Sequence, residues 1–419
     1  MSKLKEYIVN TNKKRIALVG ANSQGKTHEL IELNTDKEIK NSVIYVDSET
    51  KPDENMKNST DSTTLIDWIT QLIGIDKLNN VLDEIINDLD IDNTLNGISI
   101  SVEKSANSYK GLLKFDTKTK NNKFTNPGSG EKSLGQLIMI ENILKSKKST
   151  KYKWLLLDEP ESYLHPSLYP LIARTLNNIS EHGIKVVIAT HSPEILKYFI
   201  EDLSEVVRMK NGEIYPLNTD DYYTNLTSQI NIYNDTSLMM DSYKRIKDMT
   251  SNYFQSIIKE DIIRSVFADI VILGEGIAED EIFKFFIKKY PDFYYENNIN
   301  TIVIYGKCFI PWYLAIYKEI GINTLSIYDC DEDKNHQDKH KAINKPIEDK
   351  SDLSFKIYDN NGIKSMDIEN YLDLQAKDKA KHLISILREK WLIHDNKLLN
   401  FLSEIKEKVE QLIEKKRLP

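Results

Sequence analysis

A glycine-containing segment near the start of the sequence could bind the phosphates of a nucleotide. Residues 20–27 read Gly-Ala-Asn-Ser-Gln-Gly-Lys-Thr, which matches the pattern GxxxxGK[ST] between an apolar run and a helical period. In this pattern glycines let backbone N–H groups surround an anion, the lysine reaches the terminal phosphates and the hydroxyl group can ligate Mg²⁺. The predicted phosphate site contains Gly20, Asn22, Ser23, Gln24, Gly25, Lys26 and Thr27, with Thr27 as a Mg²⁺ ligand.

Two carboxylates follow another apolar run further along the chain. At the carboxyl end of a strand, Asp158 could hold Mg²⁺ through water and Glu159 could polarise an attacking water. His191 follows the next apolar run and could reach a γ-phosphate. Ser129 and Gly130 precede a helical segment, where backbone N–H groups could grip phosphate. An isolated acidic pair or a lone histidine more often has a structural role, so the prediction depends on the motifs together.

A second group of acidic residues predicts a divalent-cation site in the second half of the chain. Glu275 ends an apolar run and Glu279 lies one helical turn later, while Asp329 and Asp331 end a later run. Alternation along an extended chain sends Asp329 and Asp331 to the same side. Carboxylates gathered at one sheet edge repel one another unless cations neutralise them, and oxygen-only ligands suit Mg²⁺ or Mn²⁺.

A third acidic segment, Ser-Met-Asp-Ile-Glu at 365–369, could extend this site. Asp367 or Glu369 could complete a second metal position. A solvated loop explains these two residues equally well on their own.

Apolar runs of β-branched residues and leucine divide the sequence into two α/β stretches, about 1–216 and 266–375. The first stretch contains runs at 15–19, 42–46, 153–158, 185–190 and 205–209. The second contains runs at 269–276, 300–307, 323–331 and 353–359. Because helical periods separate the runs, we predict parallel sheets covered on both faces. The candidate residues then lie where strands end.

These elements suggest a division into domains. We expect a first domain over 1–219 with an inserted lobe at about 50–126, a helical connector over 220–265, a second domain over 266–375 and C-terminal amphipathic helices over 376–419. Alternating segments at 97–105 and 111–119 predict antiparallel strands within the polar lobe.

The composition limits the class of protein. The chain has 419 residues, with 64 acidic and 56 basic side chains and a net charge of −8, which argues against binding to nucleic acid by bulk charge. It has neither a run of the ~20 apolar residues that a membrane span needs nor the apolar core of a signal peptide, so we expect a soluble cytoplasmic protein. Cys308 and Cys330 lack metal-site spacing and are expected to be reduced packing residues.

In the order GxxxxGKT, SGE, LLLDEP and THS, the first-half motifs resemble the ATPase core of the ABC class, in the branch related to Rad50 and the structural-maintenance ATPases. The segment DEPESYLHP at 158–166 resembles the form DEPExxLHP of the overcoming-lysogenisation-defect (OLD) family. The resemblance implies that ATP is bound. Lys26 and Thr27 would contact its phosphates and Mg²⁺, Asp158 would be the Walker B ligand and Glu159 the catalytic base.

The same resemblance implies an assembly. Ser129 and Gly130 would form a signature loop that acts across a homodimer, and His191 would be the switch histidine. A chain with this loop is expected to be at least a homodimer.

The pattern EGxxE followed by DxD resembles a Toprim domain, the metal-dependent fold of topoisomerases, primases and OLD-family nucleases. The resemblance implies metal ligands or a general base at Glu275, Glu279, Asp329, Asp331 and Glu369. It also implies a lysine beyond the last acid that stabilises the transition state, and the candidates Lys377, Lys379 and Lys381 remain open.

An ABC-class ATPase followed by Toprim is the OLD arrangement. It implies an ATP-dependent DNA endonuclease that uses Mg²⁺ or Mn²⁺ and acts in anti-phage defence, with a partner such as a helicase or a retron reverse transcriptase and its DNA. The alternative is a nucleotide-switched sensor or scaffold with a silent Toprim half that assembles with a separate effector. The intact carboxylate set favours the nuclease.

Overall fold

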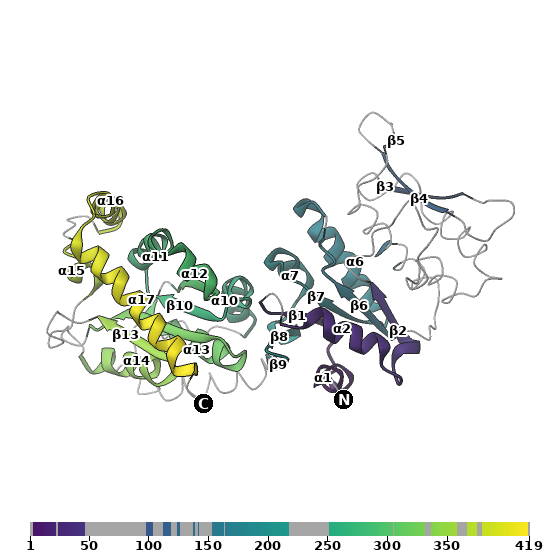
Figure 1. The fold of residues 1–419 in the computed structure, drawn as a ribbon, viewed down its shortest axis with the longest axis horizontal. Helices are drawn as coiled ribbons and strands as arrows, with labels where there is room; N and C mark the ends of the chain where they lie inside the picture. The colour runs from purple at the N-terminus through teal and green to yellow at the C-terminus, as the bar shows by residue number, and fades with distance from the viewer. Residues whose placement is uncertain are drawn as a thin grey trace. The chain divides into compact units, whose positions relative to one another are not determined.

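The parallel strands predicted from the apolar runs form two separate sheets in a computed structural model of the protein (Figure 1). The chain divides into two compact units, Met1–Ile214 and Tyr215–Pro419. The structure describes residues 3–21, 24–46, 98–103, 112–118, 124–125, 137–138, 141, 153–162, 164–217, 251–304, 306–331, 337–357, 367–374 and 379–417.

The first unit is built on a six-stranded sheet with the order β2-β6-β7-β1-β8-β9. The strands are β1 (Arg15–Val19), β2 (Val43–Val46), β6 (Trp154–Asp158), β7 (Lys185–Ala189), β8 (Val206–Lys210) and β9 (Glu213–Pro216). All except β9 are predicted runs, each correct to within one residue at either end, and their pairing is parallel. The sequence analysis missed β9, although the turn Asn211-Gly212 before it has positive φ at both residues, as a tight hairpin requires.

Helices cover this sheet on both faces. They are α1 (Lys3–Asn10), α2 (Lys26–Thr35), α6 (Tyr169–Glu181) and α7 (Pro193–Phe199), with short 3₁₀ turns η1 (Lys40–Ser42), η4 (Pro166–Leu168) and η5 (Leu203–Glu205). Leu4 of α1 and Leu30 of α2 belong to one buried cluster with Ile16, Leu156 and Val187 of the strands. Figure 1 shows α6 and α7 on the side of the sheet away from α1 and α2.

Three further strands lie within the predicted inserted lobe. They are β3 (Ile98–Glu103), β4 (Leu112–Lys118) and β5 (Phe124–Thr125). They pair in antiparallel fashion, which confirms the prediction from the two alternating segments. The remainder of the lobe and the connector up to residue 250 lie outside the described residues, and α10 (Ser251–Ser265) forms the described part of the connector.

The second unit is built on a parallel sheet with the order β11-β10-β12-β13. Its strands are β10 (Ile270–Gly274), β11 (Ile299–Val303), β12 (Asn323–Asp329) and β13 (Leu353–Ile357). Since β10 lies between β11 and β12, the carboxyl ends of these three strands are neighbours at one sheet edge. Strands β10 and β11 end earlier than their predicted runs. The chain leaves the sheet at Gly276, the N-cap residue of α11, and at Gly306, whose φ is +149°.

Helices of the second unit include the C-terminal ones, which are part of its core. The helices are α11 (Ile277–Lys289), α12 (Pro291–Glu296), α13 (Ile310–Glu319), α14 (Gln337–Lys350), α15 (Ile368–Tyr371), α16 (Lys379–Leu392) and α17 (Asn396–Arg417), with the 3₁₀ turn η6 (Lys307–Phe309). Leu387 of α16 and Phe401 and Ile405 of α17 are buried in one cluster with Ile272 and Leu325 of the sheet. Figure 1 shows α17, in yellow, crossing the sheet. Among the described residues, we find no helix with the length and apolar character needed to cross a membrane.

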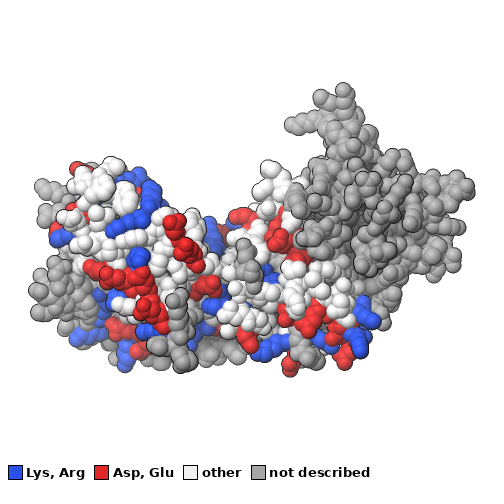
Figure 2. Space-filling view, in the orientation of Figure 1, with Lys and Arg blue, Asp and Glu red and all other residues white. Residues whose placement is uncertain are grey.

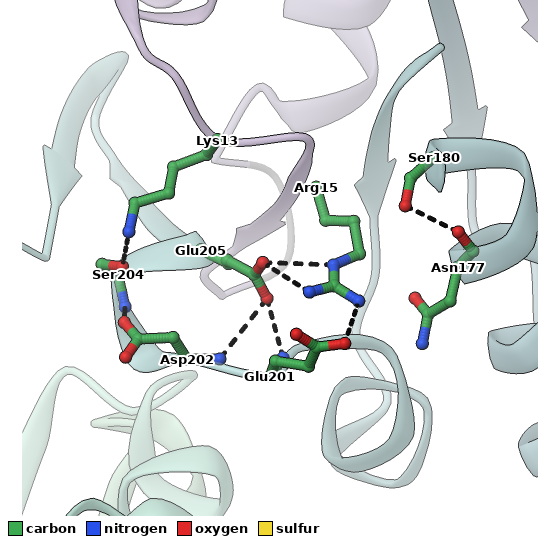
Figure 3. A network of polar contacts seen from close by, with 8 residues as sticks. All are labelled: Lys13, Arg15, Asn177, Ser180, Glu201, Asp202, Ser204 and Glu205. Atoms are coloured by element: carbon green, nitrogen blue, oxygen red, sulfur yellow. Dashed lines mark hydrogen bonds and ion pairs between the residues drawn. The ribbon is translucent and has the colours of Figure 1, made fainter. Parts of the chain in front are cut away.

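A buried ion-pair network fixes the start of β1 against the segment before β8 (Figure 3). The Arg15 guanidinium donates to Glu205 Oε1 from Nε at 3.1 Å and from Nη2 at 3.0 Å, and to Glu201 Oε1 from Nη1 at 2.7 Å. The second Glu205 oxygen accepts from the Glu201 N–H at 2.7 Å. Arg15 is 8% exposed and Glu205 is 6% exposed. The network lies at the sheet edge opposite the candidate residues, because β1 and β8 are parallel and both begin there.

Replacing Arg15 by methionine is expected to lower the free energy of unfolding of the first unit by about 3–5 kcal/mol, since Glu205 would keep a buried charge without its cation. Urea denaturation followed by circular dichroism measures this loss. Lys3→Met is the matched control, because Lys3 and Glu213 form an exposed ion pair of the kind that contributes ~0–1 kcal/mol. Equal effects of the two substitutions would contradict the prediction.

Candidate nucleotide and metal sites

The predicted phosphate loop joins β1 to α2 in the geometry that anion binding needs. Gly20 has φ of +144°, and a Cβ there would lie 2.4 Å from the carbonyl oxygen of Met209 on β8, so only glycine fits. Gly25, with φ of +89°, is the N-cap residue of α2. Backbone N–H groups in the first turn of a helix lack intrahelical acceptors and attract anions. The loop therefore presents a helix N-terminus where the motif predicts phosphate.

Lys26 is buried at the start of α2 and folds back over the loop. Its Nζ donates to the carbonyl oxygens of Gly20 and Ala21, each at 3.0 Å. Burial lowers the pKa of Lys26 to about 8, although the carboxylates of Glu159 and Asp158 act in the opposite direction. At neutral pH the ammonium form still predominates, so Lys26 can offer a positive charge to a phosphate.

The structure describes only some of the other residues predicted for the phosphate loop. Gln24 Oε1 accepts from the N–H of Asn211 at 2.6 Å, which ties the loop to the β8–β9 turn. Thr27 is exposed on the first turn of α2. Asn22 and Ser23 lie outside the described residues, as do Ser129 and Gly130 of the predicted signature loop.

Asp158 and Glu159 lie at the carboxyl end of β6, next to β7 and close to the phosphate loop after β1. Asp158 is buried as the last residue of the strand. Glu159 has φ of +46°, an uncommon conformation for a non-glycine residue, and its N–H donates to the carbonyl oxygen of Ala189 on β7 at 2.8 Å. The left-handed turn redirects the chain directly after the strand.

The Glu159 carboxylate lies between two polar side chains. Ser162 Oγ donates to Glu159 Oε2 at 3.0 Å, and His191 Nε2 lies 3.8 Å from Glu159 Oε1. Burial lowers the pKa of His191, the charge of Lys26 lowers it further and Glu159 raises it. The lowered pKa favours neutral imidazole at pH 7, which can donate one hydrogen bond from one ring nitrogen and accept one at the other. The structure thus brings together the predicted base and the predicted switch histidine.

Glu161 is a residue to which the sequence analysis gave no role. The hydroxyl of Thr190 donates to Glu161 Oε1, and the same hydroxyl oxygen accepts from the N–H of Ser192 at 2.9 Å. Burial raises the pKa of Glu161, while the hydrogen bond from Thr190 lowers it. These contacts hold the residues on both sides of His191. The motif DEPE at 158–161 contains Glu161, so the residue was visible in the sequence. Its partner Thr190, directly after β7, could not be identified from the sequence.

In the second unit, Glu275, Asp329 and Asp331 gather at the shared edge of β10 and β12. Each offers a carboxylate oxygen, and the three oxygens lie within 4.8 Å of one another. Burial raises the pKa of Asp329 well above its usual value, and the neighbouring carboxylates, Glu275 first, raise it further. Burial also raises the pKa of Glu275, against the lowering effect of Lys307. The cluster is therefore electrostatically unfavourable without a cation.

Asp331 reaches this cluster for a different reason from the one predicted. Strand alternation was expected to send Asp329 and Asp331 to the same side, but β12 ends at Asp329. Asp331 has φ of +55°, so the chain has left the extended conformation before it. The predicted convergence is present, and the turn after the strand produces it.

Glu279 and Glu369 lie near the cluster but outside the group of three. Glu279 Oε2 accepts from the N–H of Gly276 at 2.9 Å and closes the first turn of α11. Burial raises the pKa of Glu279 to about 7, and the charges of Glu275 and Glu369 add to the shift. Glu369 lies on α15, and the N–H of its neighbour Ile368 donates to Asp329 Oδ1 at 2.9 Å.

Asp367, the alternative to Glu369, serves as the N-cap of α15. Its Oδ1 accepts from the N–H of Asn370 at 2.9 Å. This contact satisfies an N–H group in the first turn of the helix, which is the ordinary function of aspartate at this position.

The three converging residues fit a hard divalent cation. They offer oxygen ligands only, as Mg²⁺ and Mn²⁺ prefer, and soft sulfur or imidazole ligands are absent from the group. A cation would also neutralise the mutual repulsion that raises their pKa values. Glu275, Asp329 and Asp331 are the residues that would hold it.

Lys307 is a site residue that the sequence analysis missed. Its Nζ donates to the carbonyl oxygen of Asp329 at 2.8 Å and to Asp331 Oδ2 at 2.9 Å. The predicted candidates for a transition-state lysine were Lys377, Lys379 and Lys381. Lys377 and the side chains of Lys379 and Lys381 lie outside the described residues. The pair Gly306-Lys307 at the end of the apolar run 300–307 was the available signal, since that run contains β11, which lies beside β10.

Two family models match separate parts of the chain. Residues 29–197 match the AAA_21 family model, whose description reads "AAA domain, putative AbiEii toxin, Type IV TA system". Residues 266–331 match the model of the overcoming lysogenization defect protein-like TOPRIM domain. The first match begins after the phosphate loop, so the assignment of that loop rests on its motif and geometry.

Two curated relatives are similar to part of the chain. Old nuclease of Escherichia phage P2 is 28% identical over 213 residues, which are 49% of this chain and 33% of that protein. Endonuclease GajA of Bacillus cereus (strain HuB5-5) is 23% identical over 260 residues, 58% of this chain and 35% of that protein. The aligned part is thus about a third of the length of these relatives. The chain thus has an ATPase domain followed by an OLD-like Toprim domain, and these matches support the OLD-family ATPase–Toprim arrangement that the motifs predicted.

Proposed function

We propose that the protein is an ATP-dependent DNA endonuclease that uses Mg²⁺ or Mn²⁺ and acts in anti-phage defence together with a partner. The observation that carries this proposal is the convergence of Glu275, Asp329 and Asp331 on one point of the Toprim half. The names of the two relatives, a nuclease and an endonuclease, support phosphodiester cleavage. A helicase or a retron reverse transcriptase with its DNA is the kind of partner that we expect.

The carboxylates of the acidic site would act by holding the cation in a fixed position. A divalent cation bound there supplies Lewis-acid stabilisation of the reacting phosphate and lowers the pKa of a coordinated water. Asp329 is oriented for this by the Ile368 N–H, and Asp331 by the Lys307 ammonium. Glu279 and Glu369 are the further carboxylates that could serve as ligands or as a general base.

The first unit would supply the nucleotide dependence. We assign phosphate binding to Lys26 and the loop around it, Mg²⁺ binding to Thr27 and Asp158, and activation of the attacking water to Glu159. His191, 3.8 Å from Glu159, would respond to the γ-phosphate. Ser129 and Gly130 would complete the site of a second copy, so we propose a homodimer or larger homo-oligomer.

DNA would have to be bound by local contacts rather than by bulk charge. The net charge is −8, and the face shown in Figure 2 has Lys and Arg interspersed with Asp and Glu over the described residues. Phosphates of DNA add favourable binding energy where they meet cations. Divalent cations at the acidic site would provide such a contact.

The purified protein is expected to nick or cut DNA when Mg²⁺ or Mn²⁺ is added, and EDTA should stop the reaction. Supercoiled plasmid, linear duplex and single-stranded DNA are incubated with each metal, with and without ATP, and separated on gels. Absence of cleavage on all three substrates under every condition would refute the nuclease proposal and favour the sensor or scaffold alternative.

A further inference from the structure

We propose that Lys307 is a positioning residue that sets Asp331 in place for divalent-cation binding. The inference rests on the proposed metal site, and it concerns how that site is built before the cation arrives. Lys307 would act through Asp331 and would not itself contact the cation.

The contacts of Lys307 are those of a fixed structural cation. The side chain is 6% exposed, and its ammonium group bridges the carbonyl oxygen of Asp329 and the carboxylate of Asp331. A lysine that binds a DNA phosphate is expected to have a solvent-accessible ammonium group, unlike Lys307. The two short contacts instead join Lys307 to the loop that carries the site.

The loop after β12 needs such an anchor, because the strand does not extend through it. Asp331 adopts φ of +55°, a region that side chains other than Asn and Asp seldom occupy. The carbonyl oxygen of Cys330, between the two acids, accepts from Asn344 Nδ2 of α14 at 2.7 Å. Lys307 and Asn344 thus hold three consecutive residues, 329–331, from two different elements.

Lys307 is itself held by the structure around it. It is the first residue of η6 and follows Gly306, whose φ of +149° suits glycine. Two residues later, Phe309 packs edge-on against Trp312 of α13, with ring centroids 6.1 Å apart. The ammonium group therefore approaches Asp331 from a fixed base, as is common for the residues that orient metal ligands.

Charge gives a second reason for a lysine at this position. Glu275, Asp329 and Asp331 lie within 4.8 Å of one another, so their charges repel in the metal-free protein. A buried ammonium group offsets part of this repulsion and keeps the carboxylates together. A neutral side chain of the same length would neither anchor Asp331 nor offset the charge.

The test is a double-mutant cycle that measures metal affinity without any turnover. Nucleotide-free wild-type protein, Lys307→Met, Asp331→Asn and the double variant are titrated with Mn²⁺, and electron paramagnetic resonance measures the free hydrated ion. Lys307→Met is expected to weaken Mn²⁺ binding by about 10–100-fold, the usual effect of losing a residue that orients a ligand. In the Asp331→Asn background the same substitution should have a clearly smaller further effect, because the anchored carboxylate is gone and only the charge offset toward Glu275 and Asp329 remains.

Two controls distinguish a loss of positioning from a general effect of removing a lysine and from misfolding. Lys284→Met removes an exposed lysine from the same unit, paired with Asp280, and should leave Mn²⁺ affinity unchanged. Circular dichroism reports whether each variant folds, and the double variant stays informative if Lys307→Met does not fold, because it removes both partners of the Lys307–Asp331 ion pair. In that case equal affinity of the double variant and Asp331→Asn supports the proposal.

Results that would overturn the positioning role of Lys307 differ from the result that would overturn the proposed metal site. Unchanged or tighter Mn²⁺ binding by Lys307→Met would show that the ammonium competes with the cation or has no effect on it. An equal loss in the Asp331→Asn background would show that Lys307 acts by another route. If wild-type protein bound Mn²⁺ no better than an Asp329→Asn variant, the metal site itself, and with it the proposed function, would fail.

Discussion

Asp329→Asn is expected to reduce DNA cleavage by at least about 10³-fold while ATP binding persists. Asp329 ends β12 at the centre of the carboxylate cluster, and asparagine keeps its shape but removes the charge that a cation needs. Losing one shared ligand removes several kcal/mol of transition-state stabilisation, and each 1.36 kcal/mol is about tenfold in rate. Initial rates of plasmid nicking with Mn²⁺ measure the loss, and Glu275→Gln should behave in the same way.

The same variant should fold at least as well as the wild type. The pKa of Asp329 is raised in the folded protein, so its ionisation at neutral pH opposes folding, and stability falls as the pH rises above the ordinary carboxyl value. Asparagine removes that repulsion, and the melting temperature in EDTA should not decrease. Asp292→Asn, an exposed acid on α12, is the control for charge removal and should cleave normally. Cleavage within tenfold of wild type by Asp329→Asn would show that the nuclease site lies elsewhere.

Lys26→Ala is expected to abolish ATP binding, whereas Glu159→Gln should bind ATP and hydrolyse it about 10²–10⁴-fold more slowly. Lys26 is the buried cation of the phosphate loop, and Glu159 is the carboxylate placed to orient water beside His191. Titration with a fluorescent nucleotide and phosphate-release assays separate the two effects. Lys37→Ala, an exposed lysine just beyond α2, serves as control. Loss of binding in both Lys26→Ala and Glu159→Gln would contradict the assigned roles.

The slow Glu159→Gln variant also tests the proposed assembly. With ATP retained, a signature loop that acts across two copies should hold the dimer together. Static light scattering with and without ATP measures the mass. A monomer under both conditions would contradict the roles proposed for Ser129 and Gly130.

Much of the fold could be predicted because parallel strands buried on both faces are continuous apolar runs. The strands of the first sheet that the apolar runs predicted were located to within one residue, and the positions of the candidate acids followed from where the strands end. The order of strands in each sheet could not be predicted, because periodicity along one strand does not identify its neighbours. Strand β9 is too short and polar for such a run, and only its Asn211-Gly212 turn indicated it.

Lys307 shows most clearly why part of the site was missed. A lysine next to a glycine has no pattern of its own, and its meaning depends on β11 lying beside β10. The reasoning for Asp331 was wrong for a related reason, since it extended strand geometry past Asp329, where β12 ends. Spacing along the chain predicted the acidic residues that the structure brings together, but the Lys307 contact that holds Asp331 depends on tertiary structure.

The C-terminal helices illustrate the same limit. Their charge spacing predicted amphipathic helices, and α16 and α17 are helical. An amphipathic pattern does not reveal which surface its apolar face covers. Here Leu387, Phe401 and Ile405 complete the core beneath the sheet that carries the acidic residues.

That packing has a consequence for the nascent chain. A ribosome produces β10, β12 and the covering helix α11 before α17, so this face of the sheet is only partly covered until residues such as Phe401 and Ile405 have left the exit tunnel. The first compact unit ends at Ile214 and is available to fold earlier, since domains generally fold as units in the order of synthesis. The phosphate loop would thus form while the acidic cluster still lacks its supporting core. During translation, the proposed nucleotide site would be complete before the proposed cation site.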